Sequence, residues 1–324
     1  MKRALIFGLT GQDGAYLSDF LLHKNYQVFG TFRRTSHKCF ERIEDLGNFE
    51  KIQTIKVDLL DSASLRNSIK QSEPDEIYNL AAQSFVGASF QQPILTSEIT
   101  GLGTLRILEA IKDLSPNSKF YQASSSEMFG NYDGIKNELS PFLPRSPYGF
   151  SKLFAHNATI NYREAYNLFA SCGILFNHES PLRGLEFVTK KITNAVSEIK
   201  FNKHKKLKLG NIDAKRDWGY AKDYVEAMWL MLQQKSPDDY VISTGQSYSV
   251  RDFLDIAFAE IDIKNWENYV EYDPTVVRPT DINELLGDSS KAQRILKWKP
   301  KTSLKQLVKI MMEYDLSYYE KIYR

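Results

Sequence analysis

Cysteine is scarce in this sequence, and long apolar runs are missing from it. Its 324 residues include two cysteines, Cys39 and Cys172, which are too few for a disulfide framework and suit a reducing compartment. The apolar run at the N-terminus is too short for a signal peptide or a membrane span, and no later run is long enough to cross a bilayer. These absences predict a cytoplasmic chain without a membrane partner.

Excess charge and clustered metal ligands are missing as well. The 42 Lys and Arg residues nearly balance 40 Asp and Glu residues, and a net charge of +2 offers no broad basic surface to nucleic acid. The five histidines are scattered without the spacing of metal ligands, so we expect no metal site. What remains is a chain long enough to bury a large core and to divide into two domains.

A glycine-rich turn follows the first predicted strand. The apolar run Lys2–Phe7 is typical of a buried parallel strand, and Tyr26–Phe32 predicts a second one. Between them, Ala15–Lys24 carries apolar residues at helical spacing. The turn GLTGQDG, residues 8–14, has glycines where a backbone must turn tightly, approach a pyrophosphate and pack a helix on a strand. Such glycines also occur in ordinary loops, but their place between strand and helix favours a dinucleotide site.

Strands and helices alternate through the first half of the chain, which predicts an α/β fold of the Rossmann type with a doubly wound parallel sheet. From about Asn177 the predicted elements become short. We therefore expect a nucleotide-binding domain over residues 1–176 and a smaller substrate-binding lobe over residues 177–324, with a chain that crosses between them more than once. The other elements predicted in the first half are helices at 65–71, 100–114 and 148–166 and strands at 75–82, 119–123 and 169–175.

Two arginines end the second predicted strand. An Asp or Glu there would bind the free 2′-hydroxyl of an adenine ribose, whereas the guanidinium groups of Arg33 and Arg34 favour a 2′-phosphate. A charge-assisted hydrogen bond to phosphate contributes about 1.5–3 kcal/mol, which is enough to favour NADP over NAD. Asp58 follows an apolar strand and is placed to contact the adenine. A solvated surface pair of arginines is the alternative.

Tyr148 and Lys152 lie four residues apart at the start of the long predicted helix, so their side chains share one face. Ser146 suits the N-cap and Pro147 the first helical position. A free tyrosine has a pKa of about 10, but a neighbouring ammonium and an oxidised nicotinamide would both favour the phenolate. This predicts that Tyr148 is a general base near neutral pH. The alternative is a tyrosine and a lysine on the surface.

Hydroxyl groups and a carboxylate end another predicted strand. Ser125 and Ser126 offer hydrogen bonds to a sugar hydroxyl, and Glu127 offers a separate acid or base. Ligands of open α/β sheets bind at the carboxyl ends of strands, which makes this position a candidate site. A serine-rich turn with a solvated glutamate is the alternative.

The sequence resembles a known family over nearly its whole length. GLTGQDG, SSSEMFG and YGFSK are similar to segments of extended short-chain dehydrogenase/reductases that act on nucleotide sugars. Longer segments resemble the GDP-mannose 4,6-dehydratase family in order and spacing: AAQSFVGASF, YQASSSEMFG, PRSPYGFSK, ILFNHESPLRG, LGNIDAKRDWGYAKDYVEAMWLMLQ and RPTDINELLGD. The resemblance implies a lyase that converts GDP-mannose to GDP-4-keto-6-deoxymannose and water, with NADP as cofactor.

The resemblance also implies roles for individual residues. Tyr148, helped by Ser125, would take the C4 hydroxyl proton while hydride leaves C4 for NADP⁺. Glu127 would remove the C5 proton, and Glu127 or a neighbour would protonate the C6 hydroxyl as it leaves as water. The same hydride would return to C6, so the cofactor would stay bound between turnovers. Lys152 would position the nicotinamide ribose.

Further contacts are expected from the resemblance and from the residue types. Expected cofactor contacts are Gly8, Thr10, Gly11, Gln12, Asp13, Gly14, Arg33, Arg34, Thr35, Ser36, Asp58, Leu59, Leu80, Ala81, Ala82, Gln83, Ser84, Tyr148, Lys152, His178 and Arg183. Expected substrate contacts are Ser84, Ser126, Asn177, Lys191, Arg216 and Arg278, although structural salt bridges are the alternative for the last three. The segment RRTS would also reach a neighbouring subunit's cofactor, which implies a homotetramer.

Three positions depart from the family pattern. Ser125 stands where the family usually has a catalytic threonine, so the hydroxyl is kept. Phe85 and Leu182 stand where longer members have His and Arg. These changes would affect sugar placement or subunit contacts more than the chemistry.

Other functions remain open at this point. The same dehydration could act on another GDP-sugar, such as GDP-D-glycero-D-manno-heptose. A nucleotide-sugar 4-epimerase or reductase would share Tyr148 and Lys152 but would not need Glu127. A protein that senses NADP without turnover is the remaining alternative, and the complete set of Ser125, Glu127, Tyr148 and Lys152 argues against it.

Overall fold

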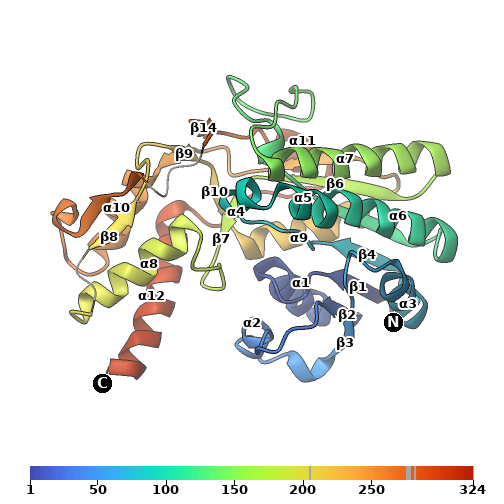
Figure 1. Ribbon diagram of the computed structural model, residues 1–324, viewed down its shortest axis with the longest axis horizontal. Helices are drawn as coiled ribbons and strands as arrows, with labels where there is room; N and C mark the ends of the chain where they lie inside the picture. The colour runs from blue at the N-terminus through green and yellow to red at the C-terminus, as the bar shows by residue number, and fades with distance from the viewer. Residues whose placement is uncertain (204–205, 275–278, 281, 324) are drawn as a thin grey trace.

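The computed structural model describes residues 1–203, 206–274, 279–280 and 282–323. Within these residues, a seven-stranded parallel sheet has the order β11-β6-β5-β4-β1-β2-β3 (Figure 1). Its strands are β1 (Arg3–Phe7), β2 (Gln27–Phe32), β3 (Ile52–Lys56), β4 (Glu76–Asn79), β5 (Lys119–Ser125), β6 (Ala170–Leu175) and β11 (Asp239–Ile242). The predicted doubly wound sheet of the Rossmann type is confirmed.

Helices cover both faces of the sheet, which explains the continuous apolar run in β1. Ala4 and Ile6 pack into the core on one face, whereas Leu5 and Phe7 pack into the core on the other. The helices α1 (Gln12–His23) and α9 (Ala221–Leu232) cover the first face. The second face is covered by α3 (Ser62–Ser72), α6 (Gly103–Leu114) and α7 (Pro147–Tyr166).

The long helix α7 begins and ends as its sequence predicts. The Ser146 side chain accepts a hydrogen bond of 3.0 Å from the backbone N–H of Gly149, and Pro147 occupies the first turn. Asn167 ends the helix in the left-handed conformation, with φ of 53°. This N-cap fixes the turn that carries Tyr148.

Some predicted boundaries differ from the structure. The helix predicted at 100–114 begins earlier, as a π-helical segment η2 (Ser97–Leu102) that continues into α6. The strand predicted at 75–82 is confined to β4, because the chain leaves the sheet after Asn79 and runs along its carboxyl edge. The helix predicted at 15–24 already begins at Gln12, directly after the glycine turn.

A second lobe packs around its own apolar core, on the left in Figure 1. Its main helices are α8 (Val188–Lys200), α10 (Val250–Ala259) and α12 (Leu304–Tyr323). The chain returns to the first lobe in between, because α9 packs on α1 and β11 pairs with β6. We propose that residues 1–176 form the nucleotide-binding domain. The elements α9 and β11, which belong to the segment 177–324, pack onto this domain.

The remaining elements are short or connect the two lobes. None of the helices within the described ranges has the length and apolarity that a membrane span requires. The short and connecting elements are α2 (Glu41–Glu44), α4 (Val86–Gln91), α5 (Pro93–Thr96), α11 (Ser290–Ile295), η1 (Phe49–Lys51), η3 (Ser126–Met128), η4 (Trp266–Tyr269), β7 (Asn177–Glu179), β8 (Leu207–Leu209), β9 (Lys215–Arg216), β10 (Trp218–Tyr220), β12 (Tyr248–Ser249), β13 (Val270–Tyr272) and β14 (Glu284–Leu285).

Candidate active site

Loops that leave β1, β4, β5 and β6 meet at the carboxyl edge of the sheet, where ligands of such sheets bind. Three neighbouring cavities lie there. The glycine-turn cavity has a volume of about 500 Å³, the central cavity about 190 Å³ and the inter-lobe cavity about 420 Å³. The first two share Gly8, Gly11 and Ser84, and the last two share Glu127, Asn177 and Phe187. The three cavities therefore follow one another along the sheet edge.

The glycine turn has the close packing that its sequence predicts. A Cβ atom on Gly14 would lie 2.3 Å from the carbonyl oxygen of Gly8, so only glycine fits there. Gly8 has φ of +91°, a conformation that L side chains rarely adopt. A Cβ atom on Gly11, in contrast, would have the Gly8 oxygen at 3.5 Å as its one protein neighbour within 4 Å among the described residues. The turn therefore leaves open space beside Gly11, at the N-terminus of α1, where a pyrophosphate would fit.

Most of the expected cofactor contacts line the first two cavities. Three residues of the RRTS segment, Arg34, Thr35 and Ser36, are exposed and line none of the three cavities described above. The glycine-turn cavity contains Gly8, Thr10, Gly11, Arg33, Asp58, Leu59, Leu80, Ala81, Ala82, Gln83 and Ser84. The central cavity contains Gln12, Asp13, Gly14, Ser125, Ser126, Glu127, Tyr148, Lys152, His178 and Arg183.

Tyr148 and Lys152 lie side by side in the central cavity. The Lys152 Nζ donates a hydrogen bond of 2.7 Å to the carbonyl oxygen of Ala123 and lies 5.8 Å from the centroid of the Tyr148 ring. Burial lowers the pKa of Lys152 to about 8, although Asp13 opposes this effect. The lysine is therefore held by the end of β5, close to the tyrosine.

The protein's own groups raise the pKa of Tyr148, so the effect expected of the neighbouring lysine is not seen. Burial raises the pKa of Tyr148 to about 12, a hydrogen bond from the Ser125 hydroxyl lowers it, and the charge of Glu127 raises it. Because burial lowers the pKa of Lys152 to about 8, the lysine has lost its charge at the pH where Tyr148 would ionise. The contribution of an oxidised nicotinamide stays a prediction.

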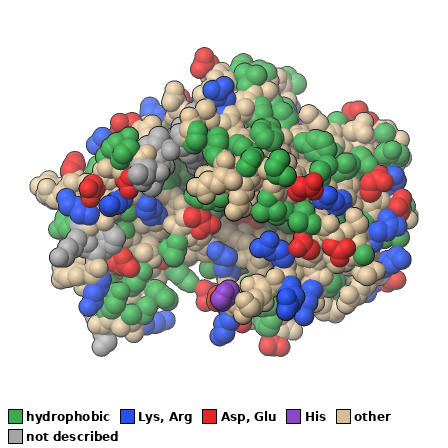
Figure 2. All heavy atoms as spheres, in the orientation of Figure 1, with side chains coloured by type: hydrophobic (Ala, Val, Ile, Leu, Met, Phe, Trp, Pro, Cys, Tyr) green, Lys and Arg blue, Asp and Glu red, His purple; other side chains and the backbone are tan. Residues whose placement is uncertain are grey.

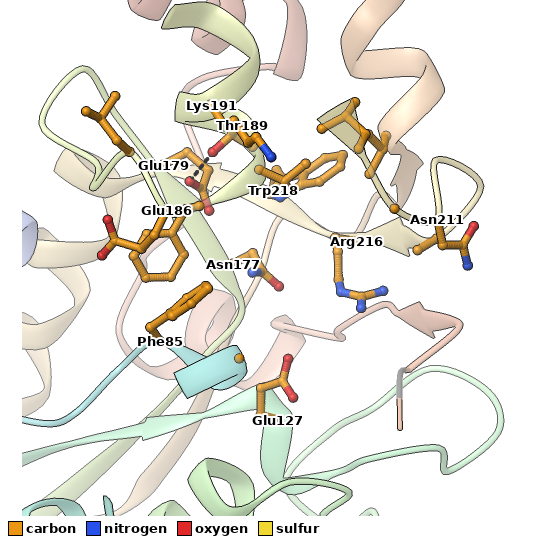
Figure 3. A pocket seen from close by; sticks show the side chains of 18 residues that line it. Phe85, Glu127, Asn177, Glu179, Glu186, Thr189, Lys191, Asn211, Arg216 and Trp218 are labelled. Carbon is orange, nitrogen blue, oxygen red and sulfur yellow. Dashed lines mark hydrogen bonds between the residues drawn. The ribbon is translucent and has the colours of Figure 1, made fainter. Parts of the chain in front are cut away.

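Glu127 connects the central and inter-lobe cavities, since its side chain lines both. Its backbone N–H donates a hydrogen bond of 3.2 Å to the Ser125 hydroxyl, which closes the turn η3 at the end of β5. Figure 3 shows the carboxylate pointing into the inter-lobe cavity, on the side of Asn177 and Arg216. A substrate in that cavity would meet Glu127 and, beyond it, Tyr148.

An ion pair forms one wall of the central cavity. The His178 Nε2 lies 2.8 Å from Asp13, and its Nδ1 lies 2.7 Å from the carbonyl oxygen of Phe176. Burial by itself would raise the pKa of Asp13, but the charge and hydrogen bond of His178 lower it to about 2. Arg183 pairs with Glu179 at 3.0 Å and covers the ring of Phe187 at 3.5 Å. The wall therefore presents a histidine and an arginine that the protein itself holds in place.

The inter-lobe cavity combines apolar walls with cationic groups (Figure 3). Phe85 and Phe187 pack edge to face, with ring centroids 5.8 Å apart, near Glu127. Lys191 and Arg216 approach from α8 and β9. Burial lowers the pKa of Lys191, which Asp273 opposes. Of the expected substrate contacts, Ser84 and Ser126 line the central cavity, and Arg278 lies outside the described residues.

Comparisons with known proteins identify the family. The family model for GDP-mannose 4,6 dehydratase matches residues 5–311. The chain is 51% identical to GDP-mannose 4,6 dehydratase 2 of Arabidopsis thaliana, over 97% of this chain and 87% of that protein. The chain belongs to the GDP-mannose 4,6-dehydratase family. The family member from Homo sapiens is 47% identical to this chain, over 97% of this chain and 91% of that protein. The member from Sinorhizobium fredii is 46% identical, over 98% of this chain and 97% of that protein.

Solved structures with lower identity share the fold of this family member. The dTDP-glucose 4,6-dehydratase of Bacillus anthracis, in complex with NAD, matches with a TM-score of 0.85 and 21% identity, over 99% of this chain and 97% of that one. RMD from Pseudomonas aeruginosa, complexed with NADPH, matches with a TM-score of 0.80 and 23% identity, over 98% and 99%. Both comparisons confirm the fold.

Several cavity residues of this family member could not be found from sequence patterns. Arg42 lines the glycine-turn cavity, and its guanidinium donates hydrogen bonds to the carbonyl oxygens of Leu182 at 2.7 Å and Thr10 at 3.0 Å. Phe187 lines two cavities, and Trp218 lines the inter-lobe cavity from β10. Arg42 lies in the short helix α2, and its contacts come from distant parts of the chain, so no local signal marks it.

Proposed function

We propose that this protein is a GDP-mannose 4,6-dehydratase, a hydro-lyase that converts GDP-mannose to GDP-4-keto-6-deoxymannose and water. The observation that carries the proposal is the position of Glu127 between the two cavities. One cavity holds Tyr148 and Lys152, and the other holds Lys191 and Arg216. A hexose at their junction would have a phenol for C4 and a carboxylate for C5 and C6. Family membership supports the same reaction.

The chain's own groups move the protons of this reaction. Tyr148 takes the C4 hydroxyl proton, and the Ser125 hydroxyl bond to Tyr148 favours the phenolate. The C4 ketone then acidifies the C5 proton, which Glu127 removes. Glu127 returns a proton to the C6 hydroxyl, which leaves as water. A nicotinamide cofactor in the glycine-turn and central cavities would accept hydride from C4 and give it back at C6. As C6 takes the hydride, C5 takes up one proton, which balances the proton that Tyr148 gained from the C4 hydroxyl.

The residues present fit a dinucleotide. The space beside Gly11 admits a pyrophosphate, as described above. Gln83 lines the glycine-turn cavity, and its Oε1 is buried without a hydrogen-bond donor in the described part of the protein. A cofactor hydroxyl or amide would satisfy that oxygen. We propose that Lys152, which lines the central cavity, contacts the nicotinamide ribose.

NADP is the form of the cofactor that we propose. Arg33 lines the glycine-turn cavity at the end of β2, where an acidic residue would favour NAD. Arg42 adds a second guanidinium to the same cavity. Guanidinium groups bind phosphate through paired hydrogen bonds, which supports recognition of a 2′-phosphate.

The GDP part of the substrate is assigned to the inter-lobe cavity. Arg216 and Lys191 would neutralise the diphosphate, since both line this cavity and Arg216 is largely buried. The Asn177 Oδ1 is buried and has no hydrogen-bond partner within the described ranges, so it would accept a hydrogen bond from a sugar hydroxyl. Ser84 and Ser126 would contact the sugar from the central cavity.

We further propose a cytoplasmic homotetramer. Ile94 and Leu95 on α5 and Phe150 and Phe154 on α7 are exposed apolar side chains. Apolar side chains gather over these helices in Figure 2. A face of this kind supports association with another copy. The exposed segment Arg33–Ser36 would then be free to reach a neighbouring subunit, and sedimentation of the purified protein tests the assembly.

Mass spectrometry of GDP-sugars tests the reaction directly. Incubation of the purified protein with NADP and GDP-mannose should give a product that has lost one water. GDP-D-glycero-D-manno-heptose, added in competition, tests the choice of sugar, and we expect GDP-mannose to have the higher kcat/KM. Faster dehydration of the heptose would move the assignment to that substrate. An isomer of unchanged mass would indicate an epimerase instead.

A further inference from the structure

His156 is a buried histidine on the helix that carries Tyr148 and Lys152, and the proposed reaction does not use it. It follows Lys152 by one helical turn and Tyr148 by two, so the three side chains form one stripe along α7. The side chain is 3% exposed, and its Nδ1 lies 2.9 Å from the Ser124 hydroxyl. Burial lowers the pKa of His156, which leaves the ring neutral at neutral pH.

Each residue of the stripe contacts a different residue at the end of β5. Tyr148 is hydrogen-bonded with the Ser125 side chain, and the Lys152 Nζ donates to the carbonyl oxygen of Ala123. The imidazole of His156 contacts Ser124, which lies between these two residues in the strand. Three contacts therefore connect α7 to the strand end, and His156 supplies one of them.

The imidazole also contacts the segment between β5 and α7. Its ring packs edge-on against Phe142, with centroids 5.3 Å apart and an interplanar angle of 75°. Phe142 in turn packs against Phe129, at 5.0 Å. Phe129 directly follows the turn η3, which contains Glu127. His156 is thus linked to the strand, the helix and the turn that carry the proposed catalytic groups.

Two charged groups act on the ring from the surrounding elements. Asp239 on β11 raises the pKa of His156, and Arg163 on α7 lowers it, after the larger effect of burial. The two groups pair with each other at 2.8 Å. Their effects on the pKa of the ring oppose each other. The contribution of His156 to this region therefore comes from its hydrogen bond to Ser124 and its packing on Phe142 rather than from charge.

We propose that His156 is a positioning residue for dehydration. Through Ser124 and Phe142, it keeps the helix that carries Tyr148 in place relative to Ser125 and Glu127. The effects of His156 on kcat and on the pH profile rest on the proposed function. Its effects on the contacts of Tyr148 and Lys152 can be measured without any substrate.

Two substitutions separate the hydrogen bond from the packing. His156→Asn places an amide where Nδ1 lies and can keep the hydrogen bond to Ser124. His156→Leu removes that hydrogen bond and leaves the buried Ser124 hydroxyl without a partner at position 156. Thr159→Val is the matched control, because Thr159 is buried on the next turn of α7 and its hydroxyl bonds only Ala155 of the same helix among the contacts described.

The expected kinetics distinguish positioning from a merely structural role. His156→Leu should lower kcat about tenfold and change the KM for GDP-mannose less than about twofold, while His156→Asn recovers most of the loss. A weaker Ser125 bond raises the pKa of Tyr148, so the acidic limb of the kcat profile should move to higher pH in His156→Leu. Thr159→Val should keep the wild-type kcat and profile. Equal kcat losses in His156→Leu and Thr159→Val, or an unmoved limb, would overturn the proposal.

Crystal structures of the variants decide the geometry independently of the sugar. In His156→Leu, the distance from the Lys152 Nζ to the Ala123 oxygen should exceed the 2.7 Å of the wild type, and the Tyr148–Ser125 contact should open. Both contacts should persist in His156→Asn. Unchanged contacts in His156→Leu would overturn the positioning role even if the reaction is as proposed. A wild-type protein that dehydrates no GDP-sugar would overturn the function and leave this comparison valid.

Discussion

Glu127 and Tyr148 line the same cavity, and the charge of Glu127 contributes to the high pKa of Tyr148. Glu127 lies in the turn η3, which directly follows β5, whereas Tyr148 lies in the first turn of α7. The two groups are therefore placed by separate elements of the chain at one cavity. In the reaction that we propose, the tyrosine would act at C4 and the carboxylate at C5 and C6 of one bound sugar.

Replacing Glu127 with glutamine should stop dehydration and leave oxidation at C4 detectable. The amide cannot take the C5 proton, and loss of a general acid–base group costs about 10²- to 10⁴-fold in rate. Single-turnover absorbance of reduced nicotinamide and product mass spectrometry separate the two steps. Glu186→Gln changes another carboxylate of the inter-lobe cavity and should keep water loss. Normal dehydration by Glu127→Gln would show that the assignment is wrong.

Lys152 should make the stability of the protein depend on pH. Burial lowers its pKa from 10.5 to about 8, so between these values the unfolded chain binds more protons than the folded one. As the pH rises through this window, the free energy of unfolding should increase by up to about 3 kcal/mol relative to Lys152→Met. Below about pH 8 this contribution is lost. Denaturant unfolding of both proteins across the window measures it, and a constant difference would contradict the burial of a charged lysine.

Arg33 and Arg34 should differ in their effect on NADP. Both side chains are exposed, but Arg33 lines the glycine-turn cavity and Arg34 does not. Arg33→Ala should raise the Kd for NADP about 10- to 100-fold and change the Kd for NAD little, since it loses a charge-assisted bond to phosphate. Arg34→Ala is the control and should change the Kd less than about threefold. Titration calorimetry measures both, and equal losses would assign the phosphate to the exposed segment.

Two glycines of the turn should fail in different ways when changed to alanine. Gly14→Ala would place a Cβ atom 2.3 Å from the Gly8 oxygen and 2.6 Å from the Leu9 oxygen, so it should lower the thermal stability. Gly11 has an extended backbone, with φ of −76°, and room for a Cβ atom. Gly11→Ala should therefore fold normally and bind NADP at least about tenfold more weakly, because the methyl group occupies the phosphate position. Unchanged NADP affinity in Gly11→Ala would contradict this position.

Local patterns predicted most elements of the first half of the chain. The apolar run in β1 predicts a strand buried on both faces, and it packs into both cores. Ser146 and Pro147 predict the start of α7, and the spacing of Tyr148 and Lys152 then puts both in one cavity. These features depend on neighbours in the sequence, which is why they could be predicted.

Features that depend on tertiary packing could not be predicted in this way. Arg42 meets Thr10 and Leu182 only because distant loops converge. The high pKa of Tyr148 comes first from burial, which the helical spacing to Lys152 does not reveal. The inter-lobe cavity needs residues from β7, α8, β9 and β10 together, so no single segment marks it.

Transfer of a label within the sugar tests the central proposal most directly. GDP-mannose that carries deuterium at C4 should give a product with deuterium at C6, as seen by NMR, and with one water lost. Reduced nicotinamide should not accumulate, because the hydride returns to the same sugar. Deuterium that is absent from C6, or reduced cofactor that forms in proportion to product, would contradict the account.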